Sequence, residues 1–148
     1  MSPFLDGPVC TKVKLCALWT SAMFCSIYAE AYRLYIPGAL ERMKAFGVNQ
    51  EFHMLWMWIA IPILMIFLSV ALPAKYNRAL NLAIGVLIFL SVAIAKVGTL
   101  ILLAKVGGPP ASPSPFRDAA VLLETAIAAF AALVVWYAWK WPRTPNAV

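Results

Sequence analysis

Residues 80–103 decide the fold of this chain. They read LNLAIGVLIFLSVAIAKVGTLILL, with Lys96 as the one charged residue among them. A helix of about 20 apolar residues is about 30 Å long, which matches the hydrocarbon core of a bilayer. Three other stretches have similar length and character, at about residues 15–36, 52–72 and 119–139. The sequence therefore predicts four membrane-spanning helices.

Composition and loop length indicate one membrane domain, residues 1–148. Hydrophobic residues make up 64% of the chain and charged residues 12%, which is about half the charged share of a soluble domain. The loops between successive stretches are short, so neighbouring helices should run antiparallel. We expect an all-α fold, a transmembrane up-down four-helix bundle whose main partner is the lipid bilayer.

The net charge of +6 does not predict a nucleic-acid partner, because the basic residues lie mostly at the ends of the apolar stretches. If both termini are cytoplasmic, the inner side holds Lys12, Lys14, Lys75, Arg78, Lys140 and Arg143. The outer side then holds Arg42, Lys44, Lys105 and Arg117. This excess of inner basic residues favours both termini in the cytoplasm.

The first apolar stretch has a second interpretation, as a secretory signal. Two lysines precede it, and residues 29–31 (AEA) form a small-x-small pattern like a cleavage site. A glutamate occupies the middle of that pattern, and the helix continues to a proline–glycine stop at residues 37–38. Both features favour a membrane helix that is not cleaved off as a signal.

Prolines and glycines shape the predicted connections. Residues 39–46 fit a short amphipathic helix on the outer surface, a lid over the mouth of the bundle, or a partly ordered loop. Pro62 falls inside the second stretch and predicts a kink there. Residues 73–78 predict a tight inner turn, and residues 107–115 an outer loop without regular structure.

Four charged residues interrupt the apolar stretches: Glu30, Arg33, Lys96 and Glu124. A charge at membrane depth is costly unless it is paired, hydrated or turned towards protein. Glu30 and Glu124 each lie about 9 Å from the outer end of their helices, and Lys96 about 13 Å. Because alternate helices run in opposite directions, these charges should converge in the outer half of the bundle.

The helix faces support this convergence. Glu124 shares a stripe with Ala120, Ala128, Ala131 and Ala138, and small residues at that spacing let helices approach closely. Lys96 shares its stripe with Thr99, and we expect it to pair with Glu124 or Glu30 rather than to reach for the headgroups. Such pairs serve either fixed structure or ligand and proton handling, and the sequence leaves both open.

No metal site or cofactor is expected. His53 is the only histidine, lies near the outer mouth, and has no second nitrogen donor to complete a metal or haem site. Cys10, Cys16 and Cys25 form no C-x-x-C pair and are predicted to be small packing or boundary residues. Nucleotide-binding and hydrolase motifs are absent from the sequence.

Several short stretches resemble a bacterial family of small four-helix integral membrane proteins of unknown function. These stretches are residues 13–19 (VKLCALW), 28–32 (YAEAY), 35–38 (YIPG), 77–81 (NRALN) and 134–143 (VVWYAWKWPR). The resemblance implies four spans and the bacterial inner membrane, and it brings no activity. In the family an aspartate stands at the position of Glu30 and an acid at that of Glu124, whereas Lys96 has no counterpart.

Three functions fit these features. The first is a non-enzymatic protein that binds or transports a small molecule or a proton through Glu30, Arg33, His53, Lys96, Thr99 and Glu124, with a homodimer as the expected transport form. The second is a structural or accessory subunit of a larger membrane complex. The third is an enzyme acting on a lipid or quinone headgroup, with Glu30 or Glu124 as general base and His53 assisting.

Overall fold

The computed structural model describes residues 9–38, 41, 44, 56–106 and 114–141. These residues form four helices and, over the described ranges, no strand. Helix α1 spans Thr11–Leu34, α4 spans Ile61–Ala71, α5 spans Ala74–Val106 and α6 spans Pro115–Lys140. A π-helical turn, η1 (Trp56–Ala60), leads directly into α4. The predicted all-α class with four helices is confirmed.

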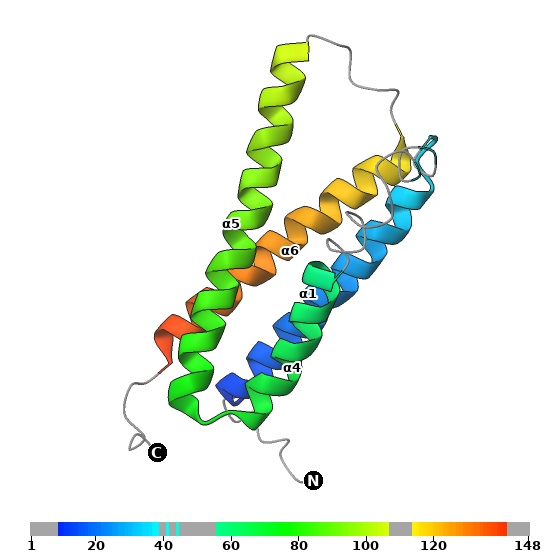
Figure 1. Ribbon diagram of the computed structural model, residues 1–148. Helices are drawn as coiled ribbons and strands as arrows, with labels where there is room; N and C mark the ends of the chain where they lie inside the picture. The colour runs from blue at the N-terminus through cyan, green and yellow to red at the C-terminus, as the bar shows by residue number, and fades with distance from the viewer. Residues whose placement is uncertain (1–8, 39–40, 42–43, 45–55, 107–113, 142–148) are drawn as a thin grey trace, which may run out of the picture.

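The helices alternate in direction (Figure 1). Helix α1 packs along α6 and α4, and α5 packs against α6. The start of α1, the α4–α5 turn and the end of α6 share one end of the bundle, here called the proximal end. The end of α1 and the start of α6 lie together at the other end, here called the distal end.

Two helices are long and apolar enough to cross a membrane, Ala74–Ile101 and Pro115–Lys140. The apolar segment Trp58–Ala71 is shorter. Helix α1 is less apolar because Thr20, Ser21, Ser26 and Glu30 lower its hydropathy. Four membrane-spanning helices are predicted. Among the described residues, two helices are long and apolar enough to cross a membrane.

The connection between α4 and α5 corrects a prediction. Residues 73–78 were expected to form a turn, with the next helix beginning near residue 80, but α5 begins at Ala74. Leu72 is extended, with φ −79° and ψ 147°, and the Pro73 carbonyl accepts from the Asn77 N–H at 3.0 Å. Proline suits a helix start because its φ is already helical and it has no N–H to satisfy. The chain thus reverses over two residues.

Pro62, where the sequence predicts a kink, is the second residue of α4 and follows the π-helical turn η1. Proline has no N–H to donate to the carbonyl four residues earlier, and its ring crowds that turn. A wider π turn is one of the adjustments by which apolar helices accommodate this loss. The π-helical turn lies where the missing N–H of Pro62 would leave a carbonyl unpaired.

Small residues bring α1, α5 and α6 together. Ala120, Ala131 and Ala138 of α6 are at most 3% exposed, and Ala128 is partly buried, so most of the alanine stripe predicted to face protein is buried. A Cβ on Gly85 of α5 would lie 2.9 Å from Val135 Cγ2, closer than real side chains approach. The apolar core beside these contacts consists of Leu15, Trp19, Met65, Ile88, Val92, Ile127, Ala131 and Val134.

The distal half of α5 leaves the other helices. Figure 1 shows α5 and α6 diverging towards the distal end. Ile94 is 70% exposed and Leu100 65% exposed, and a Cβ added to Gly98 would meet nothing within 4 Å. Large apolar side chains on this part of α5 therefore face outward.

Candidate functional site

Glu124 lies at the centre of a charged cluster that joins three helices. Its Oε1 accepts a hydrogen bond from Arg33 Nη2 of α1, and its Oε2 accepts one from Lys96 Nζ of α5 at 2.5 Å. Each carboxylate oxygen thus binds a cation from a different neighbouring helix. Hydrogen bonds between charged groups are stronger than those between neutral groups.

Glu30 completes the cluster. Arg33 Nη1 donates to Glu30 Oε1 at 2.8 Å, one helical turn away on α1. The result is a chain of alternating charges, Glu30–Arg33–Glu124–Lys96, with two cations and two anions. The Glu124 side chain is 23% exposed and that of Arg33 49%, so the cluster is partly open to the surroundings.

Local structure explains why these residues meet. Glu30 and Arg33 are three residues apart on a helix and therefore share a face. Glu124 lies one turn beyond buried Ala120, on the face that α6 turns towards α1 and α5. Lys96 lies on α5, and its long side chain carries the ammonium to Glu124 of α6. Of its two expected partners, Lys96 thus binds Glu124.

The other two predicted site residues are Thr99 and His53. Thr99 is exposed on the diverging part of α5, and its hydroxyl donates to the Ala95 carbonyl of its own helix at 2.9 Å. His53 lies outside the described residues, as does most of the segment 39–46. The structure therefore brings together Glu30, Arg33, Lys96 and Glu124 from the predicted set.

The three cysteines are free. Cys16 Sγ donates to the Ile66 carbonyl of α4 at 3.3 Å, as a small packing residue can. Within the part of the chain that the structure describes, no group of three His, Cys, Asp or Glu side chains is placed to hold a metal ion.

A second polar cluster, which the sequence analysis missed, lies in the proximal half. The Trp19 indole N–H donates to Asn81 Oδ1 at 2.7 Å, and Asn81 Nδ2 donates to Asn77 Oδ1 at 2.6 Å. Asn77 Nδ2 donates to the Ser69 carbonyl at 2.5 Å. All four residues are at most 1% exposed. This proximal network ties α1, α4 and α5 together by neutral hydrogen bonds.

Two basic residues next to this network donate hydrogen bonds to backbone carbonyls at the C-terminal ends of helices. Lys12 Nζ donates to the Val70 and Leu72 carbonyls at the end of α4, at 3.1 and 2.8 Å. Arg78 donates to the Ala138 and Trp139 carbonyls at the end of α6, at 3.1 and 3.3 Å. Cations suit helix C-termini because the last carbonyls lack partners and carry partial negative charge.

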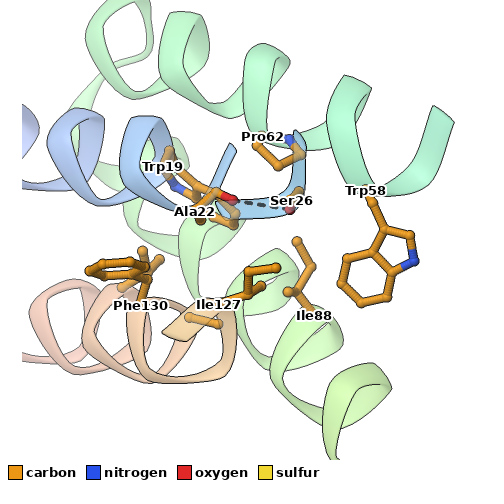
Figure 2. Close-up of a pocket in the computed structure, with 10 residues that line it drawn as sticks. Trp19, Ala22, Ser26, Trp58, Pro62, Ile88, Ile127 and Phe130 are labelled. Atoms are coloured by element: carbon orange, nitrogen blue, oxygen red, sulfur yellow. Dashed lines mark hydrogen bonds between the residues drawn. The ribbon is translucent and has the colours of Figure 1, made fainter. Parts of the chain in front are cut away.

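A small apolar hollow lies between the helices (Figure 2), and Trp19 of the proximal network forms part of its wall. All four helices contribute to its wall, which consists of Trp19, Ala22, Ser26, Trp58, Pro62, Ile88, Ile127, Phe130, Ala131 and Val134. Figure 2 shows Ile88 and Ile127 pointing into the space between the helices, with the Trp58 ring at one side. The hollow lies one helical turn from the charged cluster, since Ser26 precedes Glu30 by four residues and Ile127 follows Glu124 by three.

No family model, no curated protein and no solved structure matches this chain. The resemblance to the bacterial four-helix family therefore stays a prediction, and the function has to be argued from the geometry.

Proposed function

We propose that this protein crosses a membrane four times, through α1, η1 with α4, α5 and α6. We propose that the Glu124 cluster is its binding site for a small ionised molecule or a proton. The site would lie in the half of the membrane nearer the distal end. The observation that carries the proposal is that one carboxylate, Glu124, binds cations from two different helices.

The membrane part rests on the apolar surface. Phe67 of α4 is 67% exposed, Ile94 of α5 70% and Leu122 of α6 71%, so three helices turn large apolar side chains outward. Apolar faces of this extent are expected against lipid rather than water. The excess of basic residues on the proximal side, together with the family resemblance, supports the bacterial inner membrane with both termini in the cytoplasm.

The proposal of a binding site rests on the desolvation cost of the charged residues and on the way their bonds join three helices. Ion pairs away from water add little net stability, because desolvation offsets their attraction, so stability alone is a weak reason for them. A proton on Glu124, or an anion that attracts its cations, would weaken its bonds to Arg33 and Lys96 together. Since those bonds join α6 to α1 and α5, binding would act on the packing of three helices.

The proposal is non-enzymatic and needs no cofactor. Four helices enclose a narrow path, so we expect a transporting form to contain two copies of the chain, in contact through small residues. Either a proton or a small ionised solute would then exchange at the cluster.

The test uses purified full-length protein in two assays. Thermal unfolding in detergent is measured with panels of small carboxylates, phosphates and amines, because a ligand of the folded state raises Tm. Proton flux is measured in vesicles that enclose a pH-sensitive dye. Both assays compare wild type with Glu124→Gln, and Asp118→Asn serves as a matched control because Asp118 is an exposed acid six residues earlier on α6.

We expect at least one solute class to raise Tm, or protons to cross, in wild type and Asp118→Asn. Glu124→Gln should remove that response while remaining folded. The proposal is wrong if folded wild-type protein shows neither response, or if Glu124→Gln retains it fully.

A further inference from the structure

We infer that the proximal end of the bundle binds the headgroup of an anionic phospholipid, at the seam between the start of α1 and the end of α6. This inference rests on the membrane part of the proposed function. It concerns the opposite end of the bundle from the Glu124 cluster, and it starts from the distribution of charge between the two ends.

The described part of the proximal end carries basic side chains and no acidic one. The basic residues are Lys12, Lys14, Lys75, Arg78 and Lys140. The described acids all belong to the distal side: Glu30, Glu41, Asp118 and Glu124. In residues 1–8 and 142–148, which lie outside the described ranges, the charged side chains are Asp6 and Arg143, whose charges cancel. Unlike the charge-balanced Glu124 cluster, the proximal end therefore favours an anionic partner.

The helix C-termini at this end do not cancel its positive charge. Their last carbonyls carry partial negative charge, but Lys12 donates to those of α4 and Arg78 to those of α6. These two cations are therefore occupied within the protein. Among the described contacts, the ammonium groups of Lys14, Lys75 and Lys140 donate no hydrogen bond.

Aromatic rings hold two of these ammonium groups at the seam. Lys14 Nζ of α1 lies 5.3 Å from the centroid of the Tyr137 ring, and Lys140 Nζ lies 4.1 Å from that of the Trp136 ring. Both rings belong to one turn of α6, so the two cations share one part of its surface. A cation–π contact uses the ring face and leaves N–H groups of the ammonium for acceptors. Because the side chains are already positioned, an anion binds with less loss of conformational entropy.

The surroundings of the seam fit a phospholipid. Trp136 is 52% exposed and Trp139 65% exposed, so apolar rings flank the ammonium groups. Tryptophan beside lysine at a helix end is typical of the membrane interface, where lipid phosphates lie. The phosphate accepts from Lys14 and Lys140 while the acyl chains lie along the rings. A zwitterionic headgroup would bring its own cation towards these lysines, so an anionic lipid is preferred.

The test places full-length protein in phosphatidylcholine vesicles with a trace of phosphatidylglycerol that carries a diazirine on its acyl chain, next to the ester. A phosphatidylcholine probe with the same chain is the matched reference. After illumination, mass spectrometry quantifies the labelling of residues 136–141, and the readout is the ratio between the two probes. Competitors are unlabelled phosphatidylglycerol and glycerophosphoglycerol, which is the same headgroup without acyl chains.

We expect the anionic probe to label residues 136–141 at least about five times as strongly as the reference. Lys14→Gln and Lys140→Gln should each lower the ratio about five-fold, the effect of one basic residue beside an anionic lipid. Lys14→Arg keeps the charge and should keep the ratio. Lys75→Gln should lower it less than about two-fold, because the exposed Lys75 of α5 is not held on a ring at the seam.

Equal labelling by the two probes would overturn the inference. A loss in Lys75→Gln as large as that in Lys14→Gln would also overturn it, because the attraction would then belong to the whole proximal end. Suppression by glycerophosphoglycerol as complete as that by phosphatidylglycerol would show a site for a soluble anion instead. The wild-type ratio decides the matter even where the lysine variants fail to fold.

Failure of this inference is distinguishable from failure of the proposed function. If the two probes label equally but solutes or protons give a Glu124-dependent response, this inference fails and the proposed function stands. If the anionic probe is preferred but no such response exists, the Glu124 site fails and this inference stands. Protein that does not enter the vesicles would refute both.

Discussion

Trp19 of α1 and Asn81 of α5 are joined by a hydrogen bond of 2.7 Å although they lie 62 positions apart in the chain. Trp19 is 1% exposed and Asn81 0%, so neither can turn to water. The same indole also lines the apolar hollow. The bond therefore fixes the rotation of α1 relative to α5 and the shape of the hollow together.

Asn81→Leu should destabilise the protein, because it leaves the Trp19 N–H buried without an acceptor. The expected cost is about 1–3 kcal/mol, measured by thermal or denaturant unfolding in mild detergent. Trp19→Phe removes the donor from the other side. Both Asn81→Leu and the double variant lose the Asn81–Asn77 bond, but only the single variant also leaves the Trp19 N–H without an acceptor, so the loss in the double variant should be smaller than the sum of the two single losses. Strict additivity would show that the bond contributes nothing.

Glu124→Lys should reduce the amount of folded protein more than Glu30→Lys does. The first change places a third cation beside Arg33 and Lys96, whereas Glu30 has its described bond with Arg33 on its own helix. Adding Lys96→Glu to Glu124→Lys restores an opposite pair between α5 and α6, and should recover part of the loss. The measurement is the monodisperse peak of a fluorescent fusion in size-exclusion chromatography. Equal accumulation of all three variants would count against the cluster.

The charged cluster could be predicted because the depth of each charged residue depends only on its position along its helix. Helix length fixes depth, and alternation of direction places Glu30, Lys96 and Glu124 at similar depth before any packing is known. The alanine stripe then indicates which way Glu124 turns. The prediction of Thr99 as a site residue assumed that the stripe on α5 continues to face protein, whereas Thr99 is exposed and donates to its own helix, on the part of α5 that diverges from α6.

The proximal network was not predictable in the same way. Asn77 lies four residues after Pro73, inside the turn predicted at residues 73–78, so the next helix was expected to begin after it. Its burial depends on α5 beginning at Ala74, which turns Asn77 and Asn81, four residues apart, onto one inward face. A Trp19 near a helix end is usually an interfacial anchor. Only tertiary packing shows that its N–H meets an amide.

Gly85→Val should weaken the contact between α5 and α6. Its Cβ would lie 2.9 Å from Val135 Cγ2 and 3.2 Å from Val134 Cγ1, so a side chain must push the helices apart. Overpacking of this kind costs about 1–3 kcal/mol, visible as a lower Tm. Gly98→Ala is the matched control, because nothing lies within 4 Å of its added Cβ. That change should leave Tm equal or slightly higher, since alanine favours a helix over glycine by about 1 kcal/mol.

Cysteine accessibility in whole bacterial cells tests the proposed orientation. In a variant with the three native cysteines replaced by serine, Ser114→Cys places one thiol at the start of α6, at the distal end. Restoring Cys10 alone places the thiol at the start of α1, at the proximal end, where the residue is exposed. A membrane-impermeant maleimide should label Ser114→Cys in intact cells, and Cys10 only after the cells are opened, because the excess of basic residues in the segments expected on the inner side favours a cytoplasmic proximal end. The reverse pattern would invert the topology, and labelling of both thiols in intact cells would show that the two helix ends are not separated by a membrane.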